Sequence, residues 1–136
     1  MSYLGYTKLI THYCQATYQE ENKRKVNILE IGVDKGQTAL PLLSNLSAAG
    51  IDFLFVGIDI RTDITFVNQL NQMSNIRPAY VNAFNNNQFV SEYHPSEQNY
   101  RYVIENSLIY LPELVKQGIK FDVILLDGDH NYPTVS

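Results

Sequence analysis

The segment formed by residues 26–43 constrains the fold more than any other part of the chain. It begins with the short apolar run VNILEI, continues through a turn bracketed by Gly32 and Gly36, and opens into the stretch QTALPLL. An apolar run of this length that stops at a glycine is typical of a strand buried in a parallel sheet. Pro41 falls near the start of the expected helix, where its missing N–H costs little. The segment therefore predicts a strand–turn–helix unit of an α/β domain.

The same pattern recurs along the chain. Residues 53–59 predict a second buried strand, and Thr62 or Asp63 can cap the helix that follows it. Residues 101–105 predict a third strand with a helix over 108–117, and residues 121–127 predict a fourth and most apolar strand. Alternating strands and helices indicate a parallel sheet covered by helices, so we expect a Rossmann-like α/β fold that supplies its strands one to four.

Two segments lie outside this regular pattern. Residues 1–25 predict a leading helix that packs Leu9, Ile10 and Tyr13 inward. Residues 75–100 contain a short stretch with strand character, 77–83, but the asparagines that follow favour a long insertion loop. The expected organisation is a leading helix over 1–25 and a partial ligand-binding domain over 26–136.

Composition excludes several classes of protein. The chain has 136 residues, a formal net charge of −4 and scattered basic residues, which does not favour nucleic-acid binding. Cys14 is its one cysteine, so an internal disulfide is ruled out and a reducing compartment is favoured. No signal-peptide pattern is present, and no apolar run reaches the ~20 residues that a bilayer requires. We therefore expect a cytoplasmic protein without a membrane partner.

Acidic residues end three of the four expected strands, at Asp59, Glu105 and Asp127. Ligands of open parallel sheets bind beyond the carboxyl ends of the strands, and these acids fall there together with Glu30, the last residue but one of the first strand. A dinucleotide site needs a glycine-rich turn whose N–H groups reach a pyrophosphate, but Asp34 stands where the middle glycine would be. A carboxylate beside a pyrophosphate is repelled, so the turn disfavours an NAD-dependent oxidoreductase and favours a cofactor without phosphate.

Four segments, 26–38, 56–59, 106–114 and 121–132, together resemble a class I S-adenosylmethionine-dependent methyltransferase. The fourth expected strand ends in the sequence DGDHNY, which is similar to the small-molecule group that includes catechol, cephalosporin-biosynthesis and macrolide-sugar O-methyltransferases. The resemblance covers most of the chain after residue 26, apart from the 75–100 insertion. It implies a methyl transfer from S-adenosylmethionine to a small-molecule hydroxyl, with a sugar among the candidate acceptors.

The resemblance implies roles for individual residues. The methionine end of the cofactor would be lined by Glu30, Gly32 and Gly36. Asp59 would hold the ribose hydroxyls, and Asn106 and Ser107 would lie beside the adenine. Asp127 would lie near the sulfonium and, in metal-dependent relatives, would bind Mg²⁺. His130 would be the general base, a task that suits a group titrating near neutral pH. For Asp127 as metal ligand and His130 as base, a plain turn or loop residue is an equally good interpretation.

Two further expectations follow from the resemblance. Relatives supply more carboxylates after a fifth strand, which this sequence lacks, so Asp127 alone gives an incomplete Mg²⁺ site. The fourth strand would also become an apolar sheet edge, which predicts a truncated chain, a homo-oligomer or a completing partner chain. The alternative to an active methyltransferase is therefore a non-catalytic module that binds S-adenosylmethionine but lacks the acceptor half.

Overall fold

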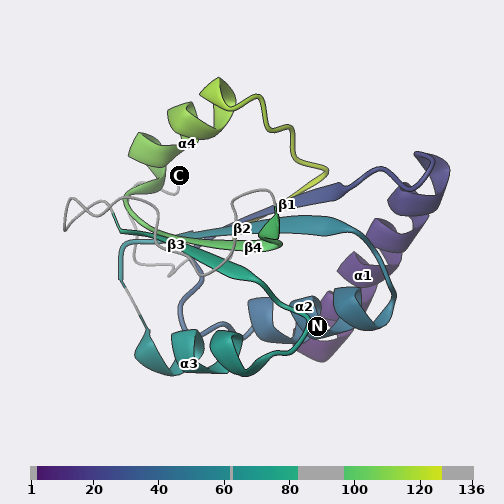
Figure 1. Ribbon diagram of the computed structural model, residues 1–136, viewed down its shortest axis with the longest axis horizontal. Helices are drawn as coiled ribbons and strands as arrows, with labels where there is room; N and C mark the ends of the chain where they lie inside the picture. Colours follow the sequence, from purple (N-terminus) through teal and green to yellow (C-terminus); the bar gives the residue numbers. More distant parts are fainter. Residues whose placement is uncertain (1–2, 62, 83–96, 127–136) are drawn as a thin grey trace.

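The computed structural model describes residues 3–61, 63–82 and 97–126 (Figure 1). Helices and strands alternate along these ranges, except that the strands at 78–82 and 100–104 follow each other among the described elements. The helices are α1 (Tyr3–Glu20), α2 (Ala39–Ala48), α3 (Ile64–Gln72) and α4 (Ser107–Lys116). The strands are β1 (Val26–Ile31), β2 (Phe53–Asp59), β3 (Pro78–Asn82), β4 (Tyr100–Ile104) and β5 (Val123–Leu126). No helix in these ranges is both long and apolar enough to cross a bilayer.

All five strands are parallel and form one sheet in the order β3-β4-β2-β1-β5. The four strands predicted from the sequence are β1, β2, β4 and β5. They lie in the order third, second, first, fourth, as expected of a Rossmann-like half-sheet. The α/β parallel fold is therefore confirmed.

The prediction of only four strands in this region is wrong, because β3 forms a fifth strand at the sheet edge beside β4. It lies in the 75–100 segment, where the sequence favoured an insertion loop. The strand is short and begins with Pro78, and a proline is tolerated as the first residue of an edge strand. Strand β3 pairs with β4, and an Asn-rich stretch separates the two strands in the sequence. No local sequence pattern therefore predicts that they pair.

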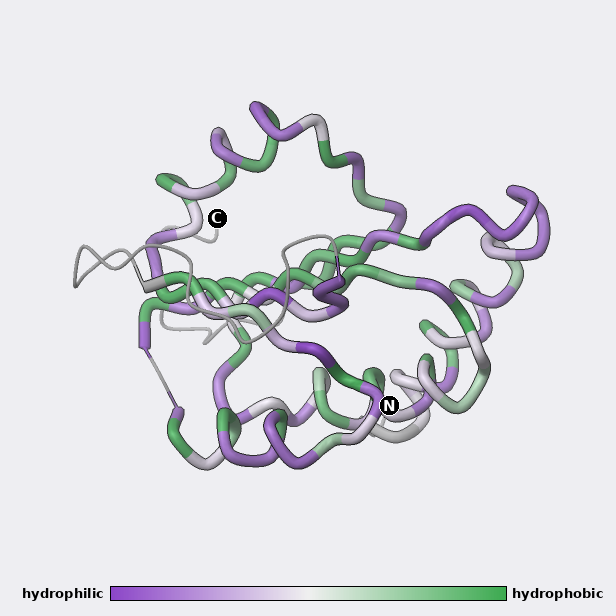
Figure 2. The backbone as a smooth tube through the Cα atoms, in the orientation of Figure 1, coloured by the Kyte–Doolittle hydropathy of each residue, from purple (hydrophilic) through white to green (hydrophobic). Residues whose placement is uncertain are grey.

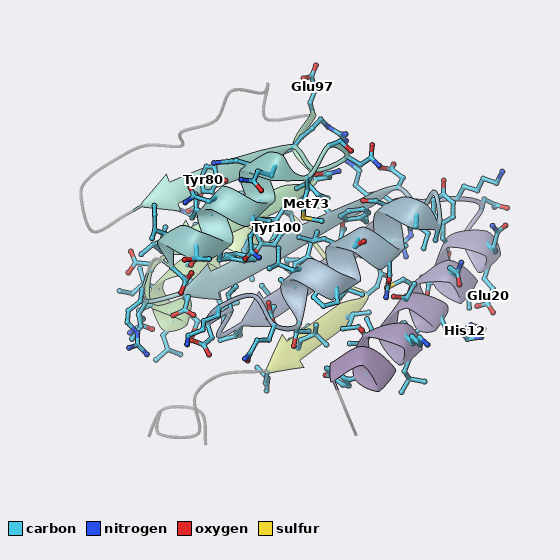
Figure 3. All side chains as sticks on the ribbon, turned by 90° about the horizontal axis from the view of Figure 1, so that it is seen from below. His12, Glu20, Met73, Tyr80, Glu97 and Tyr100 are labelled. Atoms are coloured by element: carbon cyan, nitrogen blue, oxygen red, sulfur yellow. The ribbon has the colours of Figure 1, made fainter. Side chains whose placement is uncertain are left out.

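The two faces of the sheet are covered unequally. Helices α1, α2 and α3 pack on one face, and α4 packs on the other (Figures 1 and 3). The larger core lies under the three helices, where alternate strand residues such as Ile28, Phe55 and Tyr100 are buried. The smaller core joins Leu29, Val56 and Leu114. The central strands are accordingly apolar along most of their length, as strands covered on both faces must be (Figure 2).

The leading helix is confirmed, but two of its three expected core contacts are wrong. Ile10 is buried as expected, whereas Leu9 and Tyr13 are 59% and 55% exposed. The buried positions are Thr7, Ile10 and Cys14, which follow each other at intervals of three and four residues and so share one face of the helix. This stripe packs α1 against α2 and the start of β1.

The outer strand β5 carries apolar residues into solvent. Ile124 and Leu126 are 58% and 66% exposed, on the face of the sheet that α4 covers only in part. Strand β5 pairs with β1 and has no other partner among the described strands. The expectation of an apolar sheet edge here is confirmed for the described residues.

Candidate functional site

Most of the predicted binding residues meet at the carboxyl ends of three neighbouring strands, β4, β2 and β1. Asp59 ends β2, and its register partner on β4 is Ile104. The backbone N–H of Glu105 then donates to the Asp59 carbonyl at 2.8 Å, which brings Asn106 and Ser107 beside the end of β2. The next strand of the sheet is β1, which contains Glu30 and leads directly into the glycine turn. The sheet thus gathers side chains that the sequence separates by up to 77 residues, from Glu30 to Ser107.

The glycine turn adopts a left-handed backbone at three of its residues. The φ angles are +89° at Gly32, +54° at Asp34 and +80° at Gly36. Glycine adopts this region at no steric cost, and aspartate is one of the few other residues that tolerate it. The spacing of the two glycines therefore reflects a backbone requirement, and Asp34 is compatible with it.

Asp59 ties the two loops of the site together. Its Oδ2 accepts a hydrogen bond from the Asp34 N–H at 2.7 Å, and its Oδ1 accepts one from the Arg61 N–H at 3.2 Å. The residue is only 8% exposed. A carboxylate has about four acceptor positions, so these two bonds leave capacity for hydroxyl donors of a ligand. Asp59 is therefore a structural link between the β1–α2 turn and the β2–α3 loop, whatever else it binds.

Glu30 and Tyr100 lie on the same face of the sheet beneath this turn. Glu30 is completely buried and pairs in register with Gly57 of β2. Burial raises the pKa of the Tyr100 hydroxyl well above its ordinary value, and the negative charge of Glu30 raises it further. Two polar groups are thus enclosed in the core directly below the candidate site.

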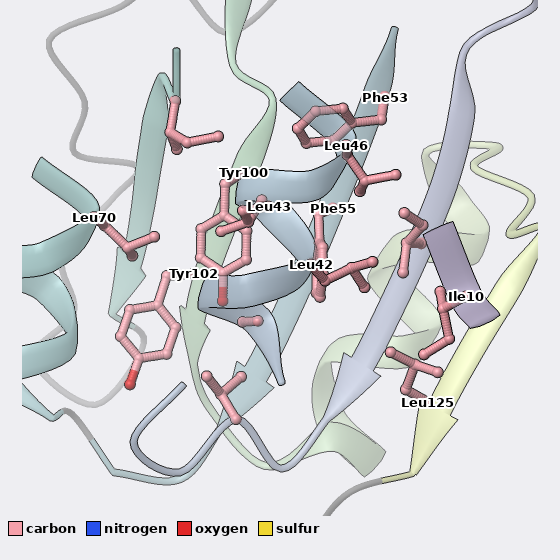
Figure 4. Packing of buried hydrophobic residues seen from close by; sticks show 14 of the residues in the cluster. Ile10, Leu42, Leu43, Leu46, Phe53, Phe55, Leu70, Tyr100, Tyr102 and Leu125 are labelled. Atoms are coloured by element: carbon pink, nitrogen blue, oxygen red, sulfur yellow. The ribbon is translucent and has the colours of Figure 1, made fainter. Parts of the chain in front are cut away.

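Gly57 has no side chain because Tyr100 occupies the space. A Cβ on Gly57 would overlap the Tyr100 hydroxyl and would stand 2.8 Å from Cγ2 of Val33 in the glycine turn. The Tyr100 hydroxyl points toward the carboxyl ends of the strands (Figure 4) and has no hydrogen-bond partner among the described residues. The close approach of turn, strand and ring explains the glycine in an otherwise apolar strand.

The loop after Asp59 rests on a second tyrosine. The Tyr102 hydroxyl donates to the Arg61 carbonyl at 3.2 Å and receives a long bond of 3.4 Å from the Asp63 N–H. Burial raises the pKa of Tyr102 to about 12, with smaller contributions from neighbouring carboxylates. Asp63 in turn caps α3, because its carboxylate accepts from the Phe66 N–H at 2.8 Å. The cap at Asp63 is confirmed.

An aromatic cluster supports the whole turn from below. It contains Phe55, Phe66, Tyr80, Tyr100 and Tyr102, whose neighbouring rings lie 5.2–6.4 Å apart, mostly edge to face. Figure 4 shows three of these rings with the leucines of α2 and α3 around them. The ring of Phe66 fills the space that a Cβ on Gly36 would take. The sequence did not predict the contacts that the Tyr100 and Tyr102 hydroxyls make.

Asn106 and Ser107 begin α4. The Asn106 side chain accepts from the Leu108 N–H at 2.9 Å and caps the helix, while its own N–H donates to Glu105 Oε1 at 2.8 Å. Asn106 is exposed, and Ser107 is half-buried as the first residue of the helix. Both residues lie after the carboxyl end of β4, beside the end of β2, and the Asn106 side-chain oxygen is already engaged in the helix cap.

Two predicted site residues, Asp127 and His130, lie outside the described residues. Within the described ranges, no three His, Cys, Asp or Glu side chains gather in a way that would hold a metal ion.

Polar contacts also lie at the amino ends of the strands, but both partners of each contact belong to the chain itself. Arg24 and Asp122 form an ion pair at 2.7 Å, and the Asn27 N–H donates to the same carboxylate at 2.9 Å. These bonds hold the pKa of Asp122 below its ordinary value. Asn99 lines an open hollow at the amino ends of β2, β3 and β4, and its amide bonds to the backbone of Asn75 and Arg77. The side chains of Arg24, Asp122 and Asn99 at the amino ends of the strands therefore have a structural role.

Comparisons of the chain with protein-family models, with curated proteins and with solved structures give no match. The methyltransferase resemblance thus depends on the residues themselves and on the arrangement described above.

Proposed function

We propose that this chain binds S-adenosylmethionine at the carboxyl ends of β1, β2 and β4 and is a methyltransferase for a small-molecule hydroxyl, with sugars as the first acceptors to test. The observation that carries the proposal is the carboxylate of Asp59, which ends β2, faces the glycine turn and has acceptor positions that no backbone N–H of the described residues fills beyond those of Asp34 and Arg61. A ribose needs such an acceptor, and open parallel sheets bind their ligands beyond the carboxyl ends of the strands near the switch point, which in this sheet lies between β1 and β5. With a single buried cysteine, a cytoplasmic location belongs to the same proposal.

The chain would contribute position and proton transfer. Asp59 would hold the ribose hydroxyls, and the left-handed turn from Gly32 to Gly36 would let the backbone pass close to the amino-acid end of the ligand. S-adenosylmethionine supplies a methyl group bound to a positively charged sulfur. His130 would take the proton of the acceptor hydroxyl, and the bound donor would supply the methyl group to that oxygen and leave as S-adenosylhomocysteine. Alignment of the two reactants would supply most of the rate enhancement.

Calorimetric titration with S-adenosylmethionine and S-adenosylhomocysteine tests the binding step. Asp59→Ala should weaken both by about 1–3 kcal/mol, the value of one or two hydrogen bonds to a charged acceptor. Asp52→Ala is the matched control, because Asp52 is an exposed acid just before the other end of β2. A folded chain that binds neither compound would rule out the proposal.

Turnover separates the enzyme from the non-catalytic module. A panel of sugar and phenol acceptors with isotopically labelled methyl donor should show transfer that His130→Ala abolishes while binding of the donor persists. Binding without transfer to any acceptor would favour the module that lacks an acceptor half.

A further inference from the structure

We propose that Tyr102 makes this site select ribosyl over deoxyribosyl ligands, because its hydroxyl holds the loop that orients the Asp59 carboxylate. The inference deepens the proposed function and rests on it, since it takes Asp59 as the acceptor for the ribose hydroxyls of the ligand. Tyr102 is fully buried and acts through the loop, so it is a positioning residue.

The orientation of the Asp59 carboxylate depends on its hydrogen bonds. The torsion that turns the carboxylate plane of an aspartate is broad, so a rotamer preference does not fix that plane. Oδ2 of Asp59 accepts from the Asp34 N–H at 2.7 Å, and Oδ1 accepts from the Arg61 N–H at 3.2 Å. Two bonds to different oxygens fix the plane, whereas a single bond would let it turn. The position of the Arg61 N–H therefore helps to decide where the other acceptor positions of Asp59 point.

The Tyr102 hydroxyl joins two backbone groups of the β2–α3 loop. It donates to the Arg61 carbonyl at 3.2 Å and accepts from the Asp63 N–H at 3.4 Å. The Arg61 N–H and the Arg61 carbonyl belong to one residue, so the Asp59 carboxylate and the Tyr102 hydroxyl hold that residue at both of its backbone polar groups. Loss of the hydroxyl would release one of these two points and loosen the N–H that Asp59 receives.

The ring of Tyr102 is itself held firmly. It meets Phe66 edge to face, with ring centroids 5.2 Å apart and planes at 90°, and Phe66 fills the space beside Gly36 of the glycine turn. In Figure 4 the Tyr102 hydroxyl points toward the carboxyl ends of the strands. A phenylalanine would fill the same space in the core, and a buried hydroxyl is costly unless it is hydrogen-bonded. The two bonds to the loop are therefore what a tyrosine adds at this position.

The experiment measures binding of two compounds to the chain by calorimetry. They are S-adenosylhomocysteine and its 2′,3′-dideoxy analogue, which differ only in the ribose hydroxyls. In the unmodified chain we expect the analogue to bind about tenfold more weakly or worse, because it offers the Asp59 carboxylate no hydroxyl donor. The ratio of the two dissociation constants, analogue over parent compound, thus reports on the ribose contacts.

Two tyrosine variants assign the selectivity to a residue. Tyr102→Phe keeps the ring and removes the hydroxyl, and the ratio should fall about threefold or more. Tyr80→Phe is the matched control, because it removes a hydroxyl of the same aromatic cluster that donates to Asn71 of α3 at 2.7 Å. Its ratio should change less than about twofold. Because the readout is a ratio, a general loss of affinity or stability does not move it.

Two variants of Arg61 test the loop from the solvent side. The Arg61 side chain is exposed, so its replacement leaves the core intact. Arg61→Gly widens the conformational freedom of the backbone that Tyr102 holds and should also lower the ratio about threefold or more. Arg61→Ala removes the same side chain without adding that freedom, so its ratio should change less than about twofold. This pair applies even if Tyr102→Phe fails to fold, and equal ratios in the two Arg61 variants would overturn the inference.

The outcomes separate the inference from the proposed function. With S-adenosylhomocysteine bound, an unchanged ratio in Tyr102→Phe would overturn the inference alone. An equal fall in Tyr80→Phe would also overturn it, because the effect would then come from a general loosening of the cluster. Equal affinity of the unmodified chain for both compounds would remove Asp59 as the ribose acceptor and the inference with it. If neither compound binds the folded chain, the proposed function and the inference both fail.

Discussion

Replacement of Gly36 by alanine is expected to lower the free energy of unfolding by about 2–5 kcal/mol, through two separable effects. The backbone at Gly36 has φ +80°, and the left-handed region costs a residue with a Cβ about 1–2 kcal/mol. The added Cβ would also overlap Cδ1 and Cε1 of Phe66. That ring is fully buried in the aromatic cluster, and overpacking a filled core typically costs about 1–3 kcal/mol.

Gly50→Ala separates the two effects. Gly50 has a similar φ of +69°, but no described atom lies within 4 Å of the position a Cβ would take. Its substitution should therefore cost only the backbone part, about 1–2 kcal/mol. Urea unfolding followed by far-ultraviolet circular dichroism measures both variants, and Phe66→Leu should recover part of the loss in Gly36→Ala but none in Gly50→Ala. Equal losses in the two alanine variants would refute the packing argument.

Three other substitutions test buried and paired groups. Tyr100→Phe removes a hydroxyl without a hydrogen-bond partner among the described residues, so urea unfolding should show unchanged stability or a gain of about 1 kcal/mol, and a clear loss would contradict this. Asp122→Asn should cost about 1 kcal/mol at pH 7 and progressively less as the pH falls below ~4, because the contacts that lower the pKa of Asp122 stabilise the fold fully above the unfolded pKa and are lost as the carboxylate is protonated. Burial raises the pKa of Cys14 to about 11, so the neutral thiol stabilises the fold fully below pH ~8.5, and this stabilisation is lost as the pH rises toward 11. The melting temperature of Cys14→Ala should therefore fall less steeply than that of the unmodified chain between pH ~8.5 and 11.

The sequence was sufficient for features that depend on neighbouring residues. The run before Gly32 predicted β1 with its observed bounds, because a buried parallel strand must be apolar on both faces. Asp63 predicted the start of α3, and the Asp63 carboxylate does accept the Phe66 N–H. The strand-end acids Glu30 and Asp59 predicted where polar groups gather, since parallel strands bring their carboxyl ends to one edge.

Features set by distant contacts could not be predicted in this way. Strand β3 pairs with β4 across an Asn-rich stretch, and the strand character of residues 77–83 did not outweigh the asparagines that follow it. The face of α1 that is buried depends on where α2 lies, so Leu9 and Tyr13 were assigned wrongly. The hydroxyl contacts of Tyr100 and Tyr102 depend on the register of three strands, which no local rule supplies.

The most consequential of these distant contacts is the one between Asp34 and Asp59, because it holds the two loops of the candidate site together without a ligand. The turn after β1 is closed onto β2 by the Asp59 carboxylate, and Phe66 supports it from below. A site held in this way loses little conformational entropy on binding, so more of its contact energy appears as affinity. The same bond also makes Asp59 part of the fold, since it fixes a left-handed aspartate in the turn. Substitutions of Asp59 should therefore change stability and ligand affinity together, whereas a residue that met only the ligand would change affinity alone.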